Sequence, residues 1–289
     1  MNADWSELQY CNNPFSPSRF ITTPVLIGKI PLGGTNHVRI QSMANTSTLD
    51  TKKSVEQAMR IFDAGADYVR FTASTTKEAE NLKFIREKLN AKGYGKPIIA
   101  DVHFNPKAAE IAAKHIEKVR INPGNFLDKK KFEHIEYTDE EYNAELKKLD
   151  EHFIHFLDVC KEHKTAIRIG TNHGSLSDRI MSRYGDTPKG MVEATMEFLR
   201  VAQKENFQNV VISLKSSNTR VMVQAYRLMV NQMVKENMNY PLHLGVTEAG
   251  EGEDGRIKSA VGIGSLLLDG IGDTIRVSLT EAPEKEIPV

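Results

Sequence analysis

Cysteine is scarce in this 289-residue chain, which has two, Cys11 and Cys160, far apart in the sequence. No CxxC pair and no Cys/His cluster occurs, which excludes a disulfide framework, a structural zinc site and a self-contained iron–sulfur site. Long hydrophobic runs are missing as well, because no apolar stretch approaches the roughly 20 residues that cross a bilayer. Residues 1–15 lack the basic and apolar regions of a secretory signal. We therefore expect a cytoplasmic protein without a membrane partner.

An excess of one charge sign is also absent. Lys+Arg and Asp+Glu both number 38, so the formal net charge is zero. Nothing in the overall charge therefore attracts nucleic acid or an anionic membrane, and any anion binding must come from the local placement of basic side chains. Hydrophobic residues make up 40% and charged residues 26%, as in ordinary globular proteins.

Eight β-branched segments alternate with segments of helical apolar spacing. The expected strands begin at Val38, Tyr68, Pro97, Lys118, Ala166, Asn209, Pro241 and Thr274. The clearest expected helices cover residues 51–63, 76–92, 188–205 and 219–236, and N-caps are expected at Asp50, Thr75 and Asn105. Strict β/α alternation predicts a parallel sheet with right-handed crossovers, and eight units in about 250 residues fit a (β/α)₈ TIM barrel. The alternative is an open doubly wound sheet, which would carry a Gly-rich turn after the first strand, where QSMANTSTLD stands.

We expect one barrel domain over residues 1–289 with three additions. Residues 22–37 carry turn residues between apolar flanks, which predicts a β-hairpin that closes the barrel's N-terminal end. Residues 126–151 are rich in charge and predict an inserted loop or helix with a solvated face, located after the fourth strand. The acidic, Gly-rich residues 251–255 are expected to form a mobile lid.

Five of the eight strands contain a β-branched residue, an arginine and an apolar residue in that order. These arginines are Arg39, Arg70, Arg120, Arg168 and Arg276. Side chains alternate along a strand, so if the β-branched neighbours face the helices, the arginines point into the barrel. An internal ion pair with Asp101 explains one arginine and leaves the others, together with Lys215, without counter-charge. The missing negative charge is most simply a ligand, and several guanidinium groups at one mouth indicate a diphosphate.

Further polar residues share the inward phase or follow the strands. Asp101 and His103 are in phase on the third strand, and Lys215 is in phase on the sixth. Glu248 follows the seventh strand as a candidate general acid or base, with an ion pair to an arginine as the alternative. The strand ends and their loops also supply Gln41, Asn122, Asn172 and Ser278. We expect no metal site in these residues.

Several runs together resemble one family. They are RIQSM, ADYVRFT, IADVHF, VRINPGN, IRIGTNHGSL, VISLKSS, HLGVTEAGEGEDG and GIGDTIRVSLT. Over residues 25–280 they are similar to the N-terminal barrel of the 4-hydroxy-3-methylbut-2-enyl diphosphate synthase family, in its larger bacterial and plant-type version. The resemblance implies an oxidoreductase of non-mevalonate isoprenoid synthesis that reductively opens 2-C-methyl-D-erythritol 2,4-cyclodiphosphate.

The resemblance also implies roles for individual residues. The cyclic diphosphate would lie among Arg70, Arg120, Arg168, Lys215 and Arg276. Hydrogen bonds would come from Asn122, Asn172 and Ser278. Asp101, His103 and Glu248 would occupy the family's polar site positions, and Glu248 would face the reacting side of the substrate.

The family's chemistry needs a [4Fe–4S] cluster, held by three cysteines and a glutamate in a C-terminal domain, and a flavodoxin or ferredoxin as electron donor. The two cysteines here do not supply those ligands. The resemblance therefore implies that this chain lacks the iron–sulfur domain and binds substrate without converting it. It also implies a homodimer of barrels, with a monomer as the alternative.

Two other functions fit the same residues. The first is a standalone phosphate-ligand-binding barrel without catalysis. The second is a cofactor-free barrel enzyme of the pterin-type or aldolase kind, in which Lys215, the sole lysine at a strand end, would form a Schiff base.

Overall fold

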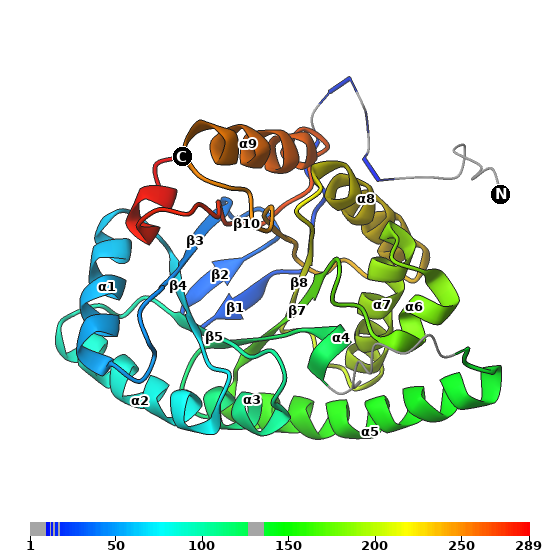
Figure 1. Cartoon of the computed structure of the whole chain (residues 1–289), viewed down its shortest axis with the longest axis horizontal. Helices are drawn as coiled ribbons and strands as arrows, with labels where there is room; N and C mark the ends of the chain where they lie inside the picture. Colours follow the sequence, from blue (N-terminus) through cyan, green and yellow to red (C-terminus); the bar gives the residue numbers. More distant parts are fainter. Residues whose placement is uncertain (1–9, 12, 14, 17, 127–135) are drawn as a thin grey trace.

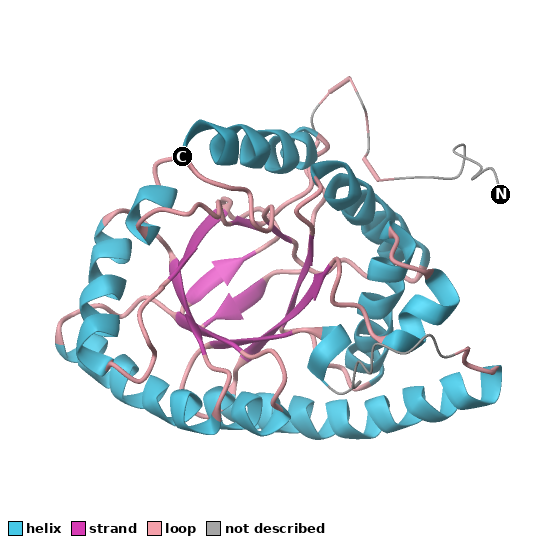
Figure 2. Ribbon diagram, viewed as in Figure 1, coloured by secondary structure: helices cyan, strands magenta, loops and turns pink. Residues whose placement is uncertain are grey.

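The computed structural model of the chain describes all residues except 1–9, 12, 14, 17 and 127–135. Eight parallel strands follow the order β8-β7-β6-β5-β4-β3-β10-β9. A parallel bridge between Ile212 and Leu242, the residue before β9, closes the ring between β8 and β9 (Figure 2). The strands are β3 (Arg39–Met43), β4 (Tyr68–Thr72), β5 (Ile98–Asp101), β6 (Lys118–Ile121), β7 (Ala166–Asn172), β8 (Val210–Lys215), β9 (His243–Leu244) and β10 (Thr274–Ile275). The predicted (β/α)₈ barrel is confirmed.

Helices surround the ring of strands (Figure 1). They are α1 (Thr51–Asp63), α2 (Thr76–Ala91), α3 (Pro106–Ala113), α4 (Pro123–Phe126), α5 (Asp139–His163), α6 (Asp178–Tyr184), α7 (Pro188–Lys204), α8 (Thr219–Lys235), α9 (Gly252–Leu268) and a final 3₁₀ turn, η2 (Pro283–Glu286). The predicted N-caps are present: Asp50, Thr75 and Asn105 each accept a backbone N–H bond from the first turn of their helix. Across the described residues, no helix is both long and apolar enough to cross a membrane.

The N-terminal hairpin lies across one end of the barrel. Its strands β1 (Val25–Ile27) and β2 (Ile30–Leu32) pair antiparallel, and both appear inside the ring of strands in Figure 1. The hairpin and the barrel share a small apolar cluster, separate from the main core. It consists of Val25, Ile27, Leu32, Tyr68, Ile99, Ala166 and Val211. Because the strand members of this cluster have the inward phase, the hairpin fills the barrel's N-terminal end with apolar side chains.

The other two expected additions are largely helical in the structure. The predicted insertion at 126–151 is in part a regular helix, since the 25-residue α5 begins at Asp139. A capping box between Thr138 and Glu141 starts this helix. Residues 127–135 lie outside the described part of the chain. The segment 251–255, expected to form a lid, is not an irregular loop. Residues 252–255 form the first turn of α9, where the carboxylates of Glu253 and Asp254 suit the helix dipole.

The hairpin's packing gives a first prediction. Leu32→Ala removes a side chain that is fully buried against the barrel interior, so we expect the free energy of unfolding to fall by about 2–5 kcal/mol in urea denaturation. Leu26→Ala is the matched control, because Leu26 is 58% exposed on the same hairpin, and its effect should stay within about 0.5 kcal/mol. Equal effects of the two substitutions would show that the hairpin does not close the core.

Candidate functional site

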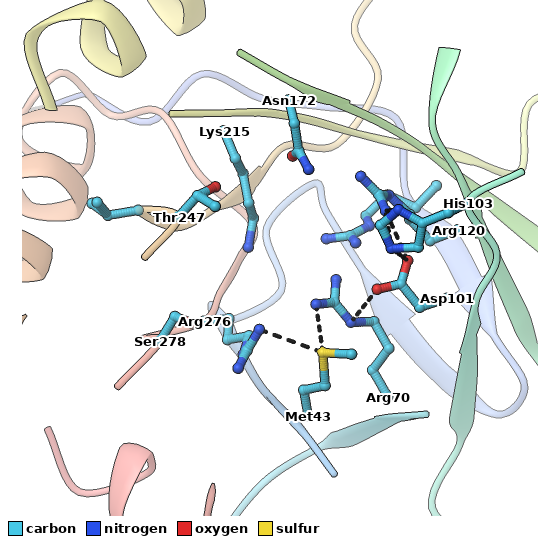
Figure 3. Close-up of a pocket in the computed structure, with 12 residues that line it drawn as sticks. Met43, Arg70, Asp101, His103, Arg120, Asn172, Lys215, Thr247, Arg276 and Ser278 are labelled. Atoms are coloured by element: carbon cyan, nitrogen blue, oxygen red, sulfur yellow. Dashed lines mark hydrogen bonds and ion pairs between the residues drawn. The ribbon is translucent and has the colours of Figure 1, made fainter. Parts of the chain in front are cut away.

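A pocket opens where the strands end. Its volume of about 210 Å³ is below the usual range of drug-sized ligand sites and suits a small compound. Its lining comes from nearly every strand of the barrel (Figure 3). The lining residues are Met43, Arg70, Asp101, His103, Arg120, Arg168, Asn172, Lys215, Val246, Thr247, Arg276 and Ser278. Nine of the thirteen site residues expected from the sequence are therefore brought together here.

Asp101 at the end of β5 organises one side of the pocket. Arg120 Nη1 donates to its Oδ1 at 2.9 Å, and Arg70 Nε lies 3.4 Å from its Oδ2. Burial raises the pKa of the Asp101 carboxyl, but Arg70 and Arg120 outweigh burial and hold that pKa well below its usual range. Arg120 also donates to the Gly170 carbonyl at 2.7 Å, and His103 Nε2 lies 3.5 Å from Asp101. Asp101 is thus an ionised carboxylate that fixes two guanidinium groups.

A second buried carboxylate, Glu286, comes from η2 and was missed by sequence reasoning, which counted Asp101 and Glu248 alone. Its Oε1 lies 3.2 Å from Arg276 Nη2, and its Oε2 accepts from the Ser42 hydroxyl at 2.8 Å. The backbone N–H of Leu279 donates to the same carboxylate at 3.1 Å. Glu286 lies beyond the last strand, where no alternation of side chains assigns it a face.

Met43 is another lining residue that the sequence argument did not name. Its sulfur accepts from Arg70 Nη2 at 2.8 Å and lies 3.6 Å from Arg276 Nη1. The thioether therefore separates two guanidinium groups on one wall of the pocket. Its position was available from the sequence, since Met43 lies two residues after Gln41 on the same strand and shares its phase.

Basic side chains outnumber carboxylates around the pocket. Arg168 is almost fully buried and, among the described residues, its Nε and Nη1 have no hydrogen-bond partner. Burial lowers the pKa of Lys215 well below its usual value, and the charges of Arg168 and Arg70 lower it further. The two carboxylates Asp101 and Glu286 therefore face five basic side chains, and the pocket favours an anion.

Four expected site residues lie away from this lining. Arg39 lies at the opposite end of the barrel, where its Nε donates to the Pro31 carbonyl at 3.1 Å and its Nη1 lies 3.4 Å from Asp67. Gln41 is buried below the pocket. The other two are Asn122, which donates to the Ser175 hydroxyl at 2.9 Å, and Glu248, which is exposed and has a φ of 52°.

The described residues do not fit an iron–sulfur cluster or another metal centre. No group of three or more His, Cys, Asp or Glu side chains within them is placed to hold a metal ion. Cys11 and Cys160 are both free thiols, and Cys160 is buried in the core. We therefore assign no chemistry through a metal to these residues.

A family profile described as the GcpE TIM-barrel domain matches residues 22–289. The chain belongs to this family. The 4-hydroxy-3-methylbut-2-en-1-yl diphosphate synthase (flavodoxin) of Parabacteroides distasonis is 65% identical over 276 residues, which cover 95% of this chain and 45% of that protein. The chloroplastic ferredoxin-type synthase of Oryza sativa subsp. japonica is 52% identical over 280 residues, covering 96% and 38%. This GcpE barrel thus spans less than half the length of these curated relatives.

Solved structures with a similar fold are distant in sequence. The dihydropteroate synthase from Stenotrophomonas maltophilia superimposes on this GcpE barrel with a TM-score of 0.57 at 13% identity, covering 92% of this chain and 96% of that one. A dihydropteroate synthase from Xanthomonas albilineans gives a TM-score of 0.56 at 11% identity, covering 91% and 94%. At such identity the likeness shows a common fold and nothing about ligands.

The contrast between Arg120, which pairs with a carboxylate, and Arg168, which does not among the described residues, gives a second prediction. Arg120→Met removes a partner of the buried Asp101 carboxylate, so the free energy of unfolding should fall by about 3–5 kcal/mol. Arg168→Met removes a buried cation with no carboxylate at ion-pair distance among the described residues, so stability should stay equal or rise. Thermal and urea denaturation of the variants, in a buffer free of phosphates and halides, measure both effects. Equal destabilisation by the two substitutions would mean that Arg168 is as well neutralised as Arg120.

Proposed function

We propose that this barrel binds a small diphosphate compound at the carboxyl ends of its strands. The observation that carries the proposal is the imbalance of five basic side chains against two carboxylates around one small pocket. Buried charges without partners are costly, and a multiply charged anion offsets that cost. Guanidinium groups match phosphate oxygens with two parallel hydrogen bonds each, which favours a phosphate over a halide or a single carboxylate in this pocket.

The spread of the basic groups supports two phosphates rather than one. They come from five different strands or strand ends, β4, β6, β7, β8 and the segment after β10. Figure 3 shows Arg70 and Arg276 on either side of Met43, with Lys215 approaching from another wall. Asn172 and Ser278 add amide and hydroxyl groups to the lining. A diphosphate reaches several of these walls at once.

The relatives' names give the product, 4-hydroxy-3-methylbut-2-en-1-yl diphosphate, and the resemblance found in the sequence implies the substrate. The compound would be 2-C-methyl-D-erythritol 2,4-cyclodiphosphate, opened reductively to 4-hydroxy-3-methylbut-2-enyl diphosphate by the longer protein. In that protein a [4Fe–4S] cluster in a C-terminal domain would supply the electrons, received from flavodoxin or ferredoxin. Since the described residues offer no ligands for a cluster, the part of this barrel is to bind and orient the cyclic diphosphate and to exclude water.

We further propose Glu248 as the proton-transferring group and Asp101 as a positioning carboxylate. A positive φ is costly for a residue other than glycine, and such strain collects at functional sites. Glu248 directly follows Thr247, which lines the pocket. Asp101 is committed to Arg70 and Arg120, so it fixes their guanidinium groups, while His103 lines the pocket and faces the ligand. Asn122 would hold the loop at Ser175.

The proposal also covers the cellular location and the oligomeric state. Both cysteines are free, which is the usual state in a reducing cytoplasm, and we place the protein there. The homodimer of barrels implied by the sequence resemblance stays a prediction, which light scattering at two protein concentrations tests.

Ligand binding gives a third prediction. Inorganic diphosphate should raise the melting temperature of the wild-type chain by mass action. Arg276→Met and Lys215→Met should each weaken diphosphate binding by about 1.5–3 kcal/mol, the scale of a charge-assisted hydrogen bond. The matched control is Arg220→Met, which changes an exposed arginine outside this pocket and should leave the affinity unchanged. Unchanged affinity in both pocket variants would contradict the proposed function.

A further inference from the structure

Below the pocket, the strand register stacks two more layers of inward-facing side chains along the barrel axis. Strands tilt in such a barrel, so side chains from alternate strands share a layer. The upper of the two layers contains Gln41, Ile99, Arg168 and His243. The lower layer contains Tyr68, Lys118, Val211 and Thr274. Beneath them lie the apolar side chains of the hairpin.

Five of these eight side chains carry buried polar atoms without a partner among the described residues. The atoms are both amide atoms of Gln41, the Tyr68 hydroxyl, Lys118 Nζ, Arg168 Nε and Nη1, and His243 Nε2. All five residues are at most 1% exposed. Buried polar groups are almost always hydrogen-bonded, because an unmade bond costs free energy. So many on facing strands of one barrel point to a common ligand on its axis.

The charge of these layers decides what kind of ligand fits. Lys118 and Arg168 are both basic, and neither has a carboxylate at ion-pair distance among the described residues. Asp101 and Glu286 are engaged with the arginines of the pocket above. The ring of Tyr68 lies 4.7 Å from Lys118 Nζ and compensates its charge in part.

The free hydrogen-bonding groups of these layers are mostly donors, so they favour an anion as the positive charge does. Burial, then Arg168 and Arg70, lower the pKa of Lys118 well below its usual value, which shows how unfavourable the ammonium is without a counter-charge. Apart from the amide oxygen of Gln41, the unpartnered atoms are hydrogen-bond donors. For His243 Nε2 this depends on the tautomer of the ring. His243 Nδ1 lies 3.4 Å from the Thr274 hydroxyl; when Nδ1 accepts that hydroxyl's hydrogen, Nε2 carries the proton and donates.

We propose that the barrel holds a single small anion, a halide such as chloride, on its axis between Arg168 and Lys118, beneath the pocket. Gln41, Tyr68 and His243 would complete its shell. The site is distinct from the pocket above, because Gln41, Tyr68, Lys118 and His243 do not line that pocket, while Arg168 contributes to both. All five side chains are at most 1% exposed, so we assign this enclosed position to the smallest kind of anion, a monatomic one, and the phosphate groups to the open pocket above. The enclosed anion neutralises charge that the ligand above does not reach.

Bromide tests this proposal directly, because it replaces chloride and scatters anomalously. Crystals of the chain are grown with inorganic diphosphate in the pocket and soaked in sodium bromide. We expect an anomalous peak in contact with Lys118 Nζ and the Arg168 guanidinium. Ordered water without an anomalous signal at that place would overturn the proposal, as would a peak confined to the pocket above.

A solution experiment separates this site from the pocket. At constant ionic strength, sodium chloride should raise the melting temperature by a few degrees over sodium gluconate. The rise should persist in Arg276→Met, which alters the pocket. It should disappear in Lys118→Met, whose apolar side chain suits a position beside the Tyr68 ring and opposite Ile99 in the strand register. A rise that survives in Lys118→Met, or is absent from the wild type, contradicts the anion site. Diphosphate affinity, measured on the same proteins, reports on the proposed function independently.

Discussion

The barrel interior holds more basic side chains than carboxylates, and a buried charge without counter-charge costs more free energy than a single packing contact returns. Asp101 and Glu286 offset part of the cost by ion pairs with Arg70, Arg120 and Arg276. Burial lowers the pKa of Lys215, and the excess of positive charge that the carboxylates leave lowers that pKa further. The same excess is the basis on which we propose an anionic ligand for this barrel.

The fold confines that charge to one open end. The hairpin β1–β2 closes the other end with Val25, Ile27 and Leu32, which keeps water from the lower layers. Helices α1 to α9 cover the outer, apolar face of the strands. An anion can thus approach the arginines from the carboxyl ends alone, and there the low dielectric strengthens each hydrogen bond that it accepts.

Periodicity in the sequence predicted the strands, most helices and the inward face of each arginine, because alternation and capping are local properties. It did not predict how far along the axis each side chain lies. Arg39 has the inward phase but is the first residue of β3, so it reaches the hairpin end and Asp67 instead of the mouth. Glu286 escaped prediction because η2 follows the last strand and no alternation assigns its face. Thr138 marked the start of α5 through its capping box, a signal available within the segment taken as an insertion.

Calorimetric titration of inorganic diphosphate and inorganic monophosphate into the wild-type chain tests the central claim most directly. If the excess positive charge is distributed around one pocket to meet two phosphates, diphosphate should bind with a stoichiometry of one. Its affinity should exceed that of monophosphate by about tenfold or more, the equivalent of about one additional charge-assisted hydrogen bond. Equal affinities for the two anions, or no heat of binding from either, would contradict the account.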